Sequence, residues 1–307
     1  MIMERALPRV ARTGAVTIAL ANQKGGVGKT TSAVNLSVML ARAGYRVLLI
    51  DNDPQGNATS SLGIEKTNLP LTTYDILVEG LEIERVALDT GRSNLSLVPS
   101  TPLLAGAEVE LVDIPNREHR LDAAIKSAQA DYDLIIIDCP PSLGLLTVNS
   151  LTAADLVIVP IQCEFLALEG VGQLITTIDL VKQQLNPSLD IIGILMTMFD
   201  GRTRLSQMVV DEVRSFFPHR IFDAYVPRSV RLAEAPSYGQ SIIEYDRSSK
   251  GADAYTAVTA ELLQRLGFSE TSPHPEPMLF ERAPEAALAV VNPGTGSNQT
   301  PQEGDPP

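Results

Sequence analysis

A glycine-rich loop contains the residues with the clearest chemistry in this sequence. Residues 24–30 read Lys-Gly-Gly-Val-Gly-Lys-Thr and lie between an apolar run and a helical pattern. Glycines let several backbone N–H groups turn toward one phosphate, and the N-terminus of the following helix adds partial positive charge. Lys29 is expected to reach the β- and γ-phosphates, and the Thr30 hydroxyl to ligate Mg²⁺. The loop therefore predicts a site for a nucleoside triphosphate.

Acidic residues follow two other apolar runs. Asp51 and Asp53 come after the run 47–50, and Asp138 closes the run 134–137. Carboxyl ends of parallel strands are where ligands bind in such sheets, so these carboxylates should lie beside the phosphate loop. We expect Asp138 to hold Mg²⁺ through water. The segment after Asp51 also contains Asp-Pro and Gln-Gly, which are ordinary turn dipeptides, so a simple turn remains an alternative there.

Short apolar runs alternate with helical patterns along the chain. The alternation predicts an α/β fold, doubly wound, with a mainly parallel sheet and helices on both faces. The helical patterns end at helix-breaking residues. The predicted strands are 16–21, 47–50, 95–98, 134–137, 156–159 and 191–196, and the clearest helices are 31–43, 168–185 and 252–266.

Length and composition indicate one domain with two extensions. The chain has 307 residues, 44% of them hydrophobic, which suits one α/β domain over 15–267 after a short extension, 1–14. Residues 268–307 contain 8 prolines and 6 acidic residues against 1 arginine, and are expected to form a disordered acidic tail. No apolar run approaches the roughly 18 to 20 residues that cross a bilayer, and no signal-peptide segment opens the sequence, so a cytoplasmic location is expected.

Charge and cysteine content exclude some classes of function. A net charge of −13 argues against a protein that coats nucleic acid with its whole surface. Residues 201–250 nevertheless hold 8 Lys/Arg and 6 Asp/Glu, so any DNA contact should be local. Cys139 and Cys163 are far apart and lack CxxC spacing, which favours neither a disulfide framework nor a zinc site.

The glycine-rich loop departs from the general phosphate-loop pattern. Gln23 stands at the first glycine position and Lys24 follows it. In this the loop resembles the deviant Walker A motif of the ParA/MinD class of P-loop ATPases, in which the early lysine, here Lys24, reaches across a dimer to the partner's phosphate. The resemblance covers roughly residues 16–267 and is nearest to the short chromosomal ParA proteins called Soj. It implies that the cofactors are ATP and Mg²⁺.

The resemblance also implies residue roles. The residue matching Asp53 positions or activates the attacking water, and the one matching Asp51 supports the Mg²⁺ and phosphate region. The segment 226–236 resembles a motif near the adenine, although Ser229 stands where most relatives carry Asn. The implied catalytic residues are Lys24, Lys29 and Asp53, and the implied nucleotide contacts are Lys24, Gly25, Gly26, Val27, Gly28, Lys29, Thr30, Thr31, Pro227 and Arg228.

The function implied by the resemblance is DNA segregation by a weak ATPase. ATP closes a homodimer, the dimer binds nonspecific DNA on the nucleoid, and a ParB-type centromere-binding protein stimulates hydrolysis and release. By the same resemblance, Arg202 and Arg231 are the implied DNA contacts. Arginine contacts to phosphates are independent of base sequence, which suits nonspecific DNA binding. Residues 1–14 are too few for a helix-turn-helix, so operator binding is not expected.

Three other kinds of protein remain as alternatives. A membrane-associated MinD-like regulator would end in a basic amphipathic helix, whereas this sequence ends in an acidic, proline-rich segment, so no membrane partner is expected. A metal-cluster ATPase would need paired cysteines at a dimer axis, which the two cysteines do not provide. A metabolic ligase of the same superfamily would turn over a small substrate without DNA.

Overall fold

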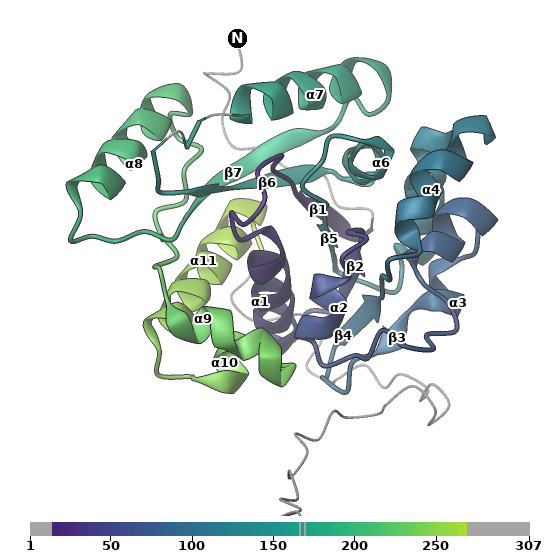
Figure 1. The fold of residues 1–307 in the computed structure, drawn as a ribbon, viewed down its shortest axis with the longest axis horizontal. Coiled ribbons are helices and arrows are strands. Elements are labelled where there is room, and N and C mark those ends of the chain that lie inside the picture. Colours follow the sequence, from purple (N-terminus) through teal and green to yellow (C-terminus); the bar gives the residue numbers. More distant parts are fainter. Residues whose placement is uncertain (1–13, 166, 169, 269–307) are drawn as a thin grey trace, which may run out of the picture.

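The fold is built on a seven-stranded sheet (Figure 1). The computed structural model describes residues 14–165, 167–168 and 170–268. The strand order is β3-β4-β2-β5-β1-β6-β7, and neighbouring strands are parallel except for the antiparallel pair β3 and β4. The strands are β1 (Val16–Leu20), β2 (Val47–Asp51), β3 (Leu88–Asp89), β4 (Leu95–Val98), β5 (Leu134–Asp138), β6 (Leu156–Gln162) and β7 (Asp190–Thr197).

The central strands are apolar at successive positions because both faces of the sheet are covered. Every residue of β1, β2, β4 and β5 is buried. Along β2, Leu48 and Ile50 pack into the cluster on one face, and Val47 and Leu49 into the cluster on the other. Side chains of a strand alternate between faces, so a strand inside two layers must be apolar throughout.

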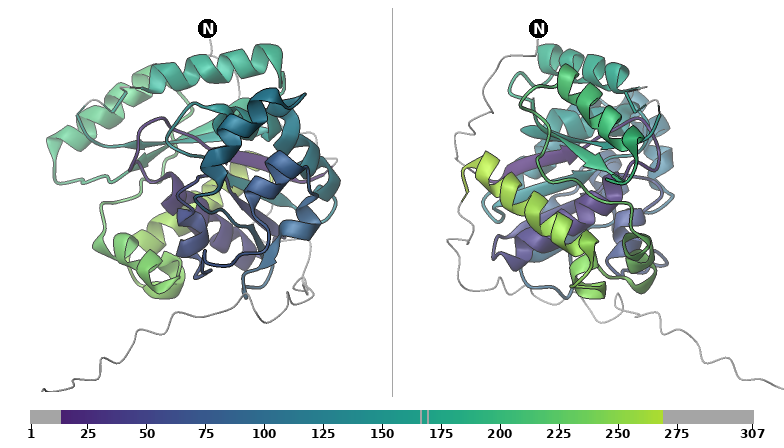
Figure 2. Two further views of the ribbon diagram at one scale, coloured as in Figure 1. Left: turned by 45° about the vertical axis from the view of Figure 1, so that its right-hand side comes forward. Right: turned by 90° about the vertical axis from the view of Figure 1, so that its left-hand side faces the viewer.

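Helices form a layer on each face (Figure 1 and Figure 2). Helices α1, α2, α9, α10 and α11 supply side chains to one apolar cluster, and α3 to α8 supply the other. The helices are α1 (Lys29–Arg42), α2 (Asn57–Ser61), α3 (Ile83–Val86), α4 (Leu104–Glu110), α5 (Arg120–Ala128), α6 (Leu145–Ala153), α7 (Val171–Gln184), α8 (Arg204–Phe216), α9 (Val230–Glu234), α10 (Ile242–Tyr245) and α11 (Lys250–Leu266), with a π-helical turn η1 (Asp75–Glu79) and 3₁₀ turns η2 (Leu111–Asp113), η3 (Arg117–His119) and η4 (Ala235–Tyr238).

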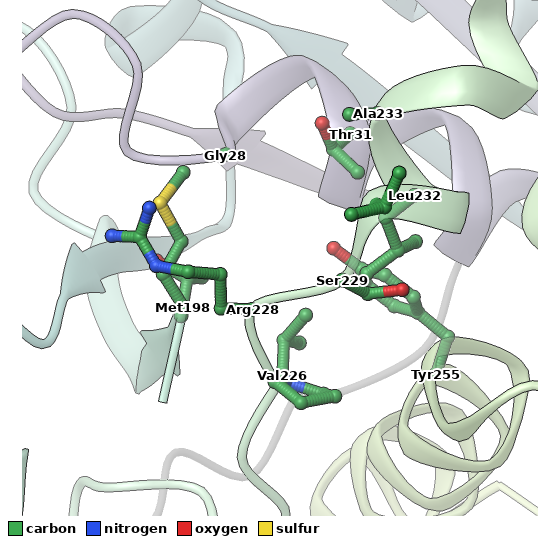
Figure 3. Close-up of a pocket in the computed structure, with 12 residues that line it drawn as sticks. Gly28, Thr31, Met198, Val226, Arg228, Ser229, Leu232, Ala233 and Tyr255 are labelled. Carbon is green, nitrogen blue, oxygen red and sulfur yellow. The ribbon is translucent and has the colours of Figure 1, made fainter. Parts of the chain in front are cut away.

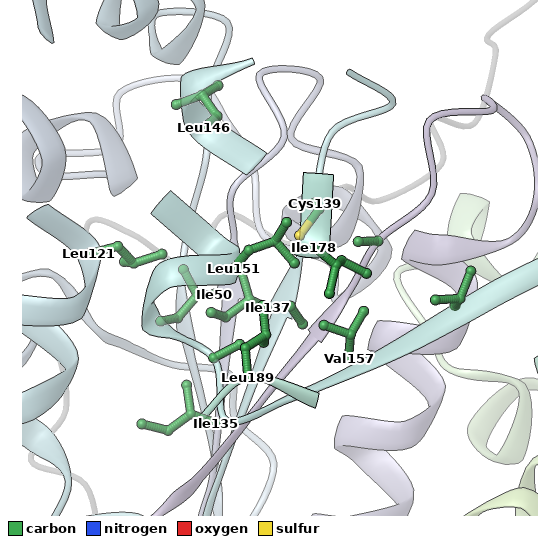
Figure 4. Packing of buried hydrophobic residues seen from close by; sticks show 14 of the residues in the cluster. Ile50, Leu121, Ile135, Ile137, Cys139, Leu146, Leu151, Val157, Ile178 and Leu189 are labelled. Atoms are coloured by element: carbon green, nitrogen blue, oxygen red, sulfur yellow. The ribbon is translucent and has the colours of Figure 1, made fainter. Parts of the chain in front are cut away.

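Packing behind the carboxyl end of β5 is apolar. Ile135, Ile137 and Cys139 belong to the same buried cluster as Leu121 of α5 and Leu151 of α6 (Figure 4). Both cysteines are buried and free, as small apolar residues would be. The strand end that carries Asp138 is thus fixed in a dry environment, which controls the electrostatics of the site.

The predicted fold class is confirmed, and the differences are local. All six predicted strands are present, with ends that differ by at most three residues. The two-residue strand β3 was not predicted. The helix predicted over 168–185 begins only at Val171, because Gly170 adopts a left-handed conformation with φ 79° before it. Among the described residues, no helix is both long and apolar enough to cross a bilayer. The predicted extension 1–14 and tail 268–307 lie, except for Gly14 and Phe268, outside the described residues.

Candidate nucleotide-binding site

The glycine-rich loop joins the carboxyl end of β1 to the start of α1. Gly26 and Gly28 have φ values of 74° and 87°, a left-handed backbone that favours glycine. At the start of the loop, the Asn22 side-chain amide donates to the Pro160 carbonyl oxygen at 2.7 Å, and its oxygen accepts from the Lys24 backbone N–H at 3.0 Å. The loop is therefore anchored to the neighbouring strand β6.

Strand β7 supports the other end of the loop. The Thr197 hydroxyl donates to the Val27 carbonyl oxygen at 2.9 Å, and both groups are buried. A side-chain Cβ at Gly28 would lie 3.6 Å from the Thr197 methyl carbon. Strands β6 and β7 thus each hold the loop by a hydrogen bond.

The two lysines of the loop differ in their surroundings. Lys29 is buried, and its ammonium donates to the Lys24 carbonyl oxygen at 3.1 Å. Burial lowers the pKa of Lys29, and the nearby carboxylates of Asp138 and Asp53 oppose that shift. Lys24 is half-buried. The lysines in ion pairs within the described ranges are Lys126 and Lys182, so the Lys24 ammonium has no such partner there.

Asp138 is a buried carboxylate at the carboxyl end of β5. It is the register partner of Asp51 on the adjacent strand β2. Both carboxylate oxygens are buried, and neither has a well-formed hydrogen bond within the described part of the chain. Burial and the charge of Asp51 raise the pKa of Asp138 well above its usual value, while the nearby Thr30 side chain lowers it. A cation bound between Asp138 and Thr30 would relieve this cost, and oxygen ligands of this kind suit Mg²⁺.

Asp51 is tied to the segment that follows it. One of its oxygens accepts from the Thr59 backbone N–H at 2.8 Å and from the Thr59 hydroxyl at 2.7 Å. The other accepts from the Asp53 backbone N–H at 3.3 Å. Burial raises the pKa of Asp51 to about 6, against the effect of these hydrogen bonds. In this geometry Asp51 orients α2 and the Asp53 loop.

Asp53 lies in the turn between β2 and α2 and is 6% exposed. One carboxylate oxygen accepts from the Gln55 backbone N–H at 2.9 Å, and the Asp53 carbonyl oxygen accepts from the Ser100 hydroxyl at 2.8 Å. These contacts show an ordinary turn, as the dipeptide composition allowed. They also leave the other carboxylate oxygen without a hydrogen bond to the described residues.

A cavity of about 360 Å³ opens beside the loop (Figure 3). It brings Gly28 and Thr31 next to the predicted late segment, from which Pro227, Arg228 and Ser229 line the wall. The Arg228 guanidinium pairs with Glu164 at 2.7 Å. Four more lining residues, Val226, Val230, Leu232 and Ala233, belong to the same predicted segment 226–236. The sequence did not predict the other three, which are Thr197, Met198 and Tyr255.

Signals for some of these lining residues were present in the sequence. Thr197 and Met198 follow the last predicted strand, at a sheet edge where ligands are expected, so their position alone could have indicated them. Tyr255 belongs to α11 and reaches the site through a hydrogen bond of 2.9 Å between its hydroxyl and that of Ser32. Helical periodicity marks Tyr255 only as a core residue.

The two predicted DNA-contacting arginines lie on connected segments. A backbone bridge between Phe199 and Pro227 joins the loop before α8 to the segment before α9. Arg202 lies in that loop, and Arg231 lies in the first turn of α9. Arg202 is 90% exposed and contacts Asp200 through two nitrogens, at 2.9 and 2.8 Å.

Arg231 is also paired with acids. Its guanidinium lies 3.0 Å from Glu234 and 3.6 Å from Asp246, and 56% of its side chain is exposed. Each arginine therefore already has a carboxylate partner within the subunit.

Comparison with known proteins places this site in context. A family model described as an AAA domain matches residues 15–191. The chain is 55% identical to the "Chromosome partitioning protein ParA" of Myxococcus xanthus, over 81% of this chain and 88% of that protein. It is 52% identical to the "Sporulation initiation inhibitor protein Soj" of Bacillus subtilis, over 80% of this chain and 97% of that protein.

A solved structure is similar in fold and sequence. It is the protein from Mycobacterium smegmatis described as cobyrinic acid a,c-diamide synthase with bound ATP analogue and magnesium. The identity is 40%, the TM-score is 0.73, and the match covers 82% of this chain and 96% of that one.

Proposed function

This chain belongs to the ParA/Soj family of chromosome partitioning ATPases, and we propose that it is an ATP-driven dimer that holds nonspecific DNA. A ParB-type centromere-binding protein stimulates its weak ATP hydrolysis and so releases it from DNA. The proposal places the protein on the nucleoid, as part of DNA segregation.

The proposal rests on the different surroundings of Lys24 and Lys29 in the loop. The buried Lys29 ammonium is held inside the loop by the Lys24 carbonyl, where it would meet the β- and γ-phosphates. The Lys24 backbone serves the loop of its own subunit, whereas its ammonium has no ion-pair partner among the described residues. A lysine with this arrangement is available to a second copy's phosphate, which links nucleotide binding to dimerisation.

The carboxylates supply the remaining parts of an ATPase site. Thr30 and Asp138 would hold Mg²⁺, with Asp51 supporting them, and bound Mg²⁺ would neutralise charge that develops on the phosphates. Asp53, with one carboxylate oxygen unpartnered, orients the attacking water. The cavity lined by Pro227, Arg228 and Ser229 takes the adenine.

A variant pair tests the role of the two lysines. Lys29→Ala is expected to abolish ATP binding, whereas Lys24→Gln keeps ATP binding but loses the ATP-dependent doubling of mass in light scattering. Lys126→Gln is the control, because this exposed lysine on α5 pairs with Asp122 and with no other acid among the described residues. If Lys24→Gln dimerises with ATP as the wild type does, Lys24 has no role across subunits.

The similarity to a protein described as a diamide synthase favours one other candidate, a small-molecule ligase. ATP turnover separates the two. A partitioning ATPase is stimulated synergistically by DNA and its ParB-type partner and is indifferent to cobyrinic acid. Stimulation by cobyrinic acid with an amide donor, and none by DNA and partner, would replace the proposed function with the ligase.

A further inference from the structure

Two segments that are distant in the sequence touch through their backbones. They lie between the turn 52–56, here called the Asp53 loop, and the exposed surface around Arg231 and its acidic partners, here called the Arg231 surface. Gly63, just after α2, and Gly239, just after η4, have φ values of 82° and 64°. A Cβ on Gly239 would lie 2.6 Å from the Gly63 Cα, closer than side-chain carbons approach. Both positions therefore need glycine, and the segments that follow α2 and η4 cannot slide past each other independently.

Arg92 fastens this contact. It lies in the turn between β3 and β4, and its side chain is 17% exposed. Its guanidinium donates to the Leu62 carbonyl oxygen at 2.9 Å and to the Gly239 carbonyl oxygen at 2.8 Å, one on each side of the glycine contact. It also donates to both carboxylate oxygens of Glu244, at 2.7 and 3.2 Å. A planar guanidinium with a bidentate carboxylate fixes orientation as well as distance.

The first of these segments, which contains Leu62 and Gly63, is connected through α2 to the Asp53 loop. Helix α2 begins four residues after Asp53, and Asp51 holds it through two hydrogen bonds to Thr59. Leu62, the acceptor for Arg92, closes this helix. A shift of the Asp53 loop therefore moves the group that Arg92 grips.

The second segment, which contains Gly239, is connected through Arg92 and Glu244 to the Arg231 surface. Glu244 belongs to α10 and is held by the Ser241 backbone and hydroxyl, both at 2.8 Å. The two residues after Glu244 contact Arg231 or its partner Glu234. The Tyr245 hydroxyl donates to Glu234 at 3.1 Å, and Asp246 lies 3.6 Å from the Arg231 guanidinium. A shift of α10 therefore changes the ion pairs that occupy Arg231.

We propose that Arg92 is a positioning residue that couples the Asp53 loop to the Arg231 surface, so that the bound nucleotide sets DNA affinity. The inference rests on the proposed function. Arg92 touches neither the loop 24–30 nor Arg231, and it acts through Leu62, Gly239 and Glu244. Coupling of this kind is a ratio of affinities, separable from the stability that any partly buried ion pair contributes.

The experiment measures DNA affinity with ATP and with ADP, and takes the ratio for each variant. Arg92→Gln is expected to reduce the wild-type ratio at least about fivefold, the lower range of measured couplings, with unchanged ATP affinity and ATP-dependent dimerisation. Glu244→Gln keeps hydrogen-bond acceptance and should reduce the ratio less. The Arg92→Gln, Glu244→Gln double variant should lose no more than Arg92→Gln alone, because the two residues act as one unit.

A matched control separates coupling from stability. Arg46 forms a partly buried pair with Asp133 at 2.9 Å and also donates to the Ala130 carbonyl oxygen, at the amino ends of β2 and β5, away from both sites. Arg46→Gln should lower the melting temperature but keep the wild-type ratio. Should Arg92→Gln fail to fold, Arg92→Lys, which keeps the charge and loses the fork, must show the reduced ratio.

The outcomes distinguish the two levels of the argument. If wild-type protein binds DNA equally with ATP and ADP, the proposed function fails and this inference fails with it. If the wild type depends on ATP and the folded Arg92 and Glu244 variants keep its full ratio, Arg92 is only a structural staple and the inference alone is overturned.

Discussion

The arginine surface gives the most quantitative prediction. Arg202 and Arg231 lie on segments joined by the Phe199–Pro227 bridge, and both are more than half exposed. If they are the phosphate contacts, a dimer presents four such contacts. Each contact contributes about 0.9 to the slope of log affinity against log salt. The Arg202→Ala, Arg231→Ala variant should therefore flatten the slope by about 3.6, and either single variant by about 1.8.

The slope difference is large enough to measure. Raising the salt from 50 to 200 mM weakens DNA binding of both proteins. With a slope difference of about 3.6, the fold-loss of affinity of the wild type should be roughly 150 times that of the double variant. Fluorescence anisotropy with ATP and two duplexes of unrelated sequence gives the slopes. The loss should be equal for both duplexes, because phosphate contacts do not read bases.

The ion pairs within the subunit supply an opposite control. Asp200 holds Arg202 through two hydrogen bonds, so a DNA phosphate has to displace that carboxylate. Asp200→Asn should therefore raise DNA affinity at every salt concentration. Arg85→Ala, on α3 at the far end of the molecule from α8, should leave the slope unchanged (Figure 1).

Arg231 requires one more control, because Val230 and Leu232 line the cavity beside the loop. A nucleotide titration must show wild-type ATP affinity in each variant before its DNA data count. An unchanged salt slope in a double variant that still binds ATP and dimerises would refute this surface and direct attention to other cations, such as Arg204 and Lys250.

Other predictions concern the hydrolytic loop and the glycine contact. Asp53→Ala should bind ATP and accumulate as a DNA-bound dimer without hydrolysing it, and wild-type phosphate release in this variant would exclude the water-orienting role. Burial raises the pKa of Asp51 to about 6, so the wild type without Mg²⁺ should lose on the order of 1 kcal/mol of stability as the pH rises from 5 to 7.5. Asp51→Asn should lose less stability over this range, with Asp138, whose pKa burial also raises, accounting for what remains. Parallel urea-unfolding profiles for the two proteins would contradict the shift at Asp51. Gly239→Ala should destabilise by at least twice the roughly 1 kcal/mol expected for Gly91→Ala, where φ is a similar 71° but no described residue beyond its chain neighbours lies within 4 Å of the added Cβ. Equal melting temperatures would show that the Gly63 contact yields.

The fold was predictable from the sequence because the signals were local and repeated. A strand buried on both faces must be apolar throughout, and β1, β2, β4 and β5 show this plainly. Strand β3 has only two residues, Leu88 and Asp89, both half-buried, and two residues carry no periodicity. Its antiparallel pairing with β4 depends on tertiary context.

The site was predictable where the chain order itself encodes the geometry. A loop between a strand and a helix places Lys29 and Thr30 together without further information. The pairing of Asp51 with Asp138 instead needs the strand order, since β2 and β5 are neighbours only after the sheet forms. Arg92 gave no sequence signal, because a single arginine in a turn acquires its role from carbonyl groups of Leu62 and Gly239 that fold beside it.

Charge balance gives a physical reason for an early lysine in this loop. Asp51, Asp53 and Asp138 are all buried near the phosphate site, and Lys29 is the buried cation among them. Mg²⁺ bound at Asp138 would be shared between these carboxylates and the triphosphate, so one subunit supplies the phosphates with little net positive charge. The Lys24 ammonium of a second copy would add positive charge at the contact between the subunits, and an ionic contact is stronger there than at an exposed surface. In the proposed cycle, hydrolysis would remove the γ-phosphate and with it the group that attracts this lysine. Loss of the dimer after hydrolysis would then follow from electrostatics, without a separate release device.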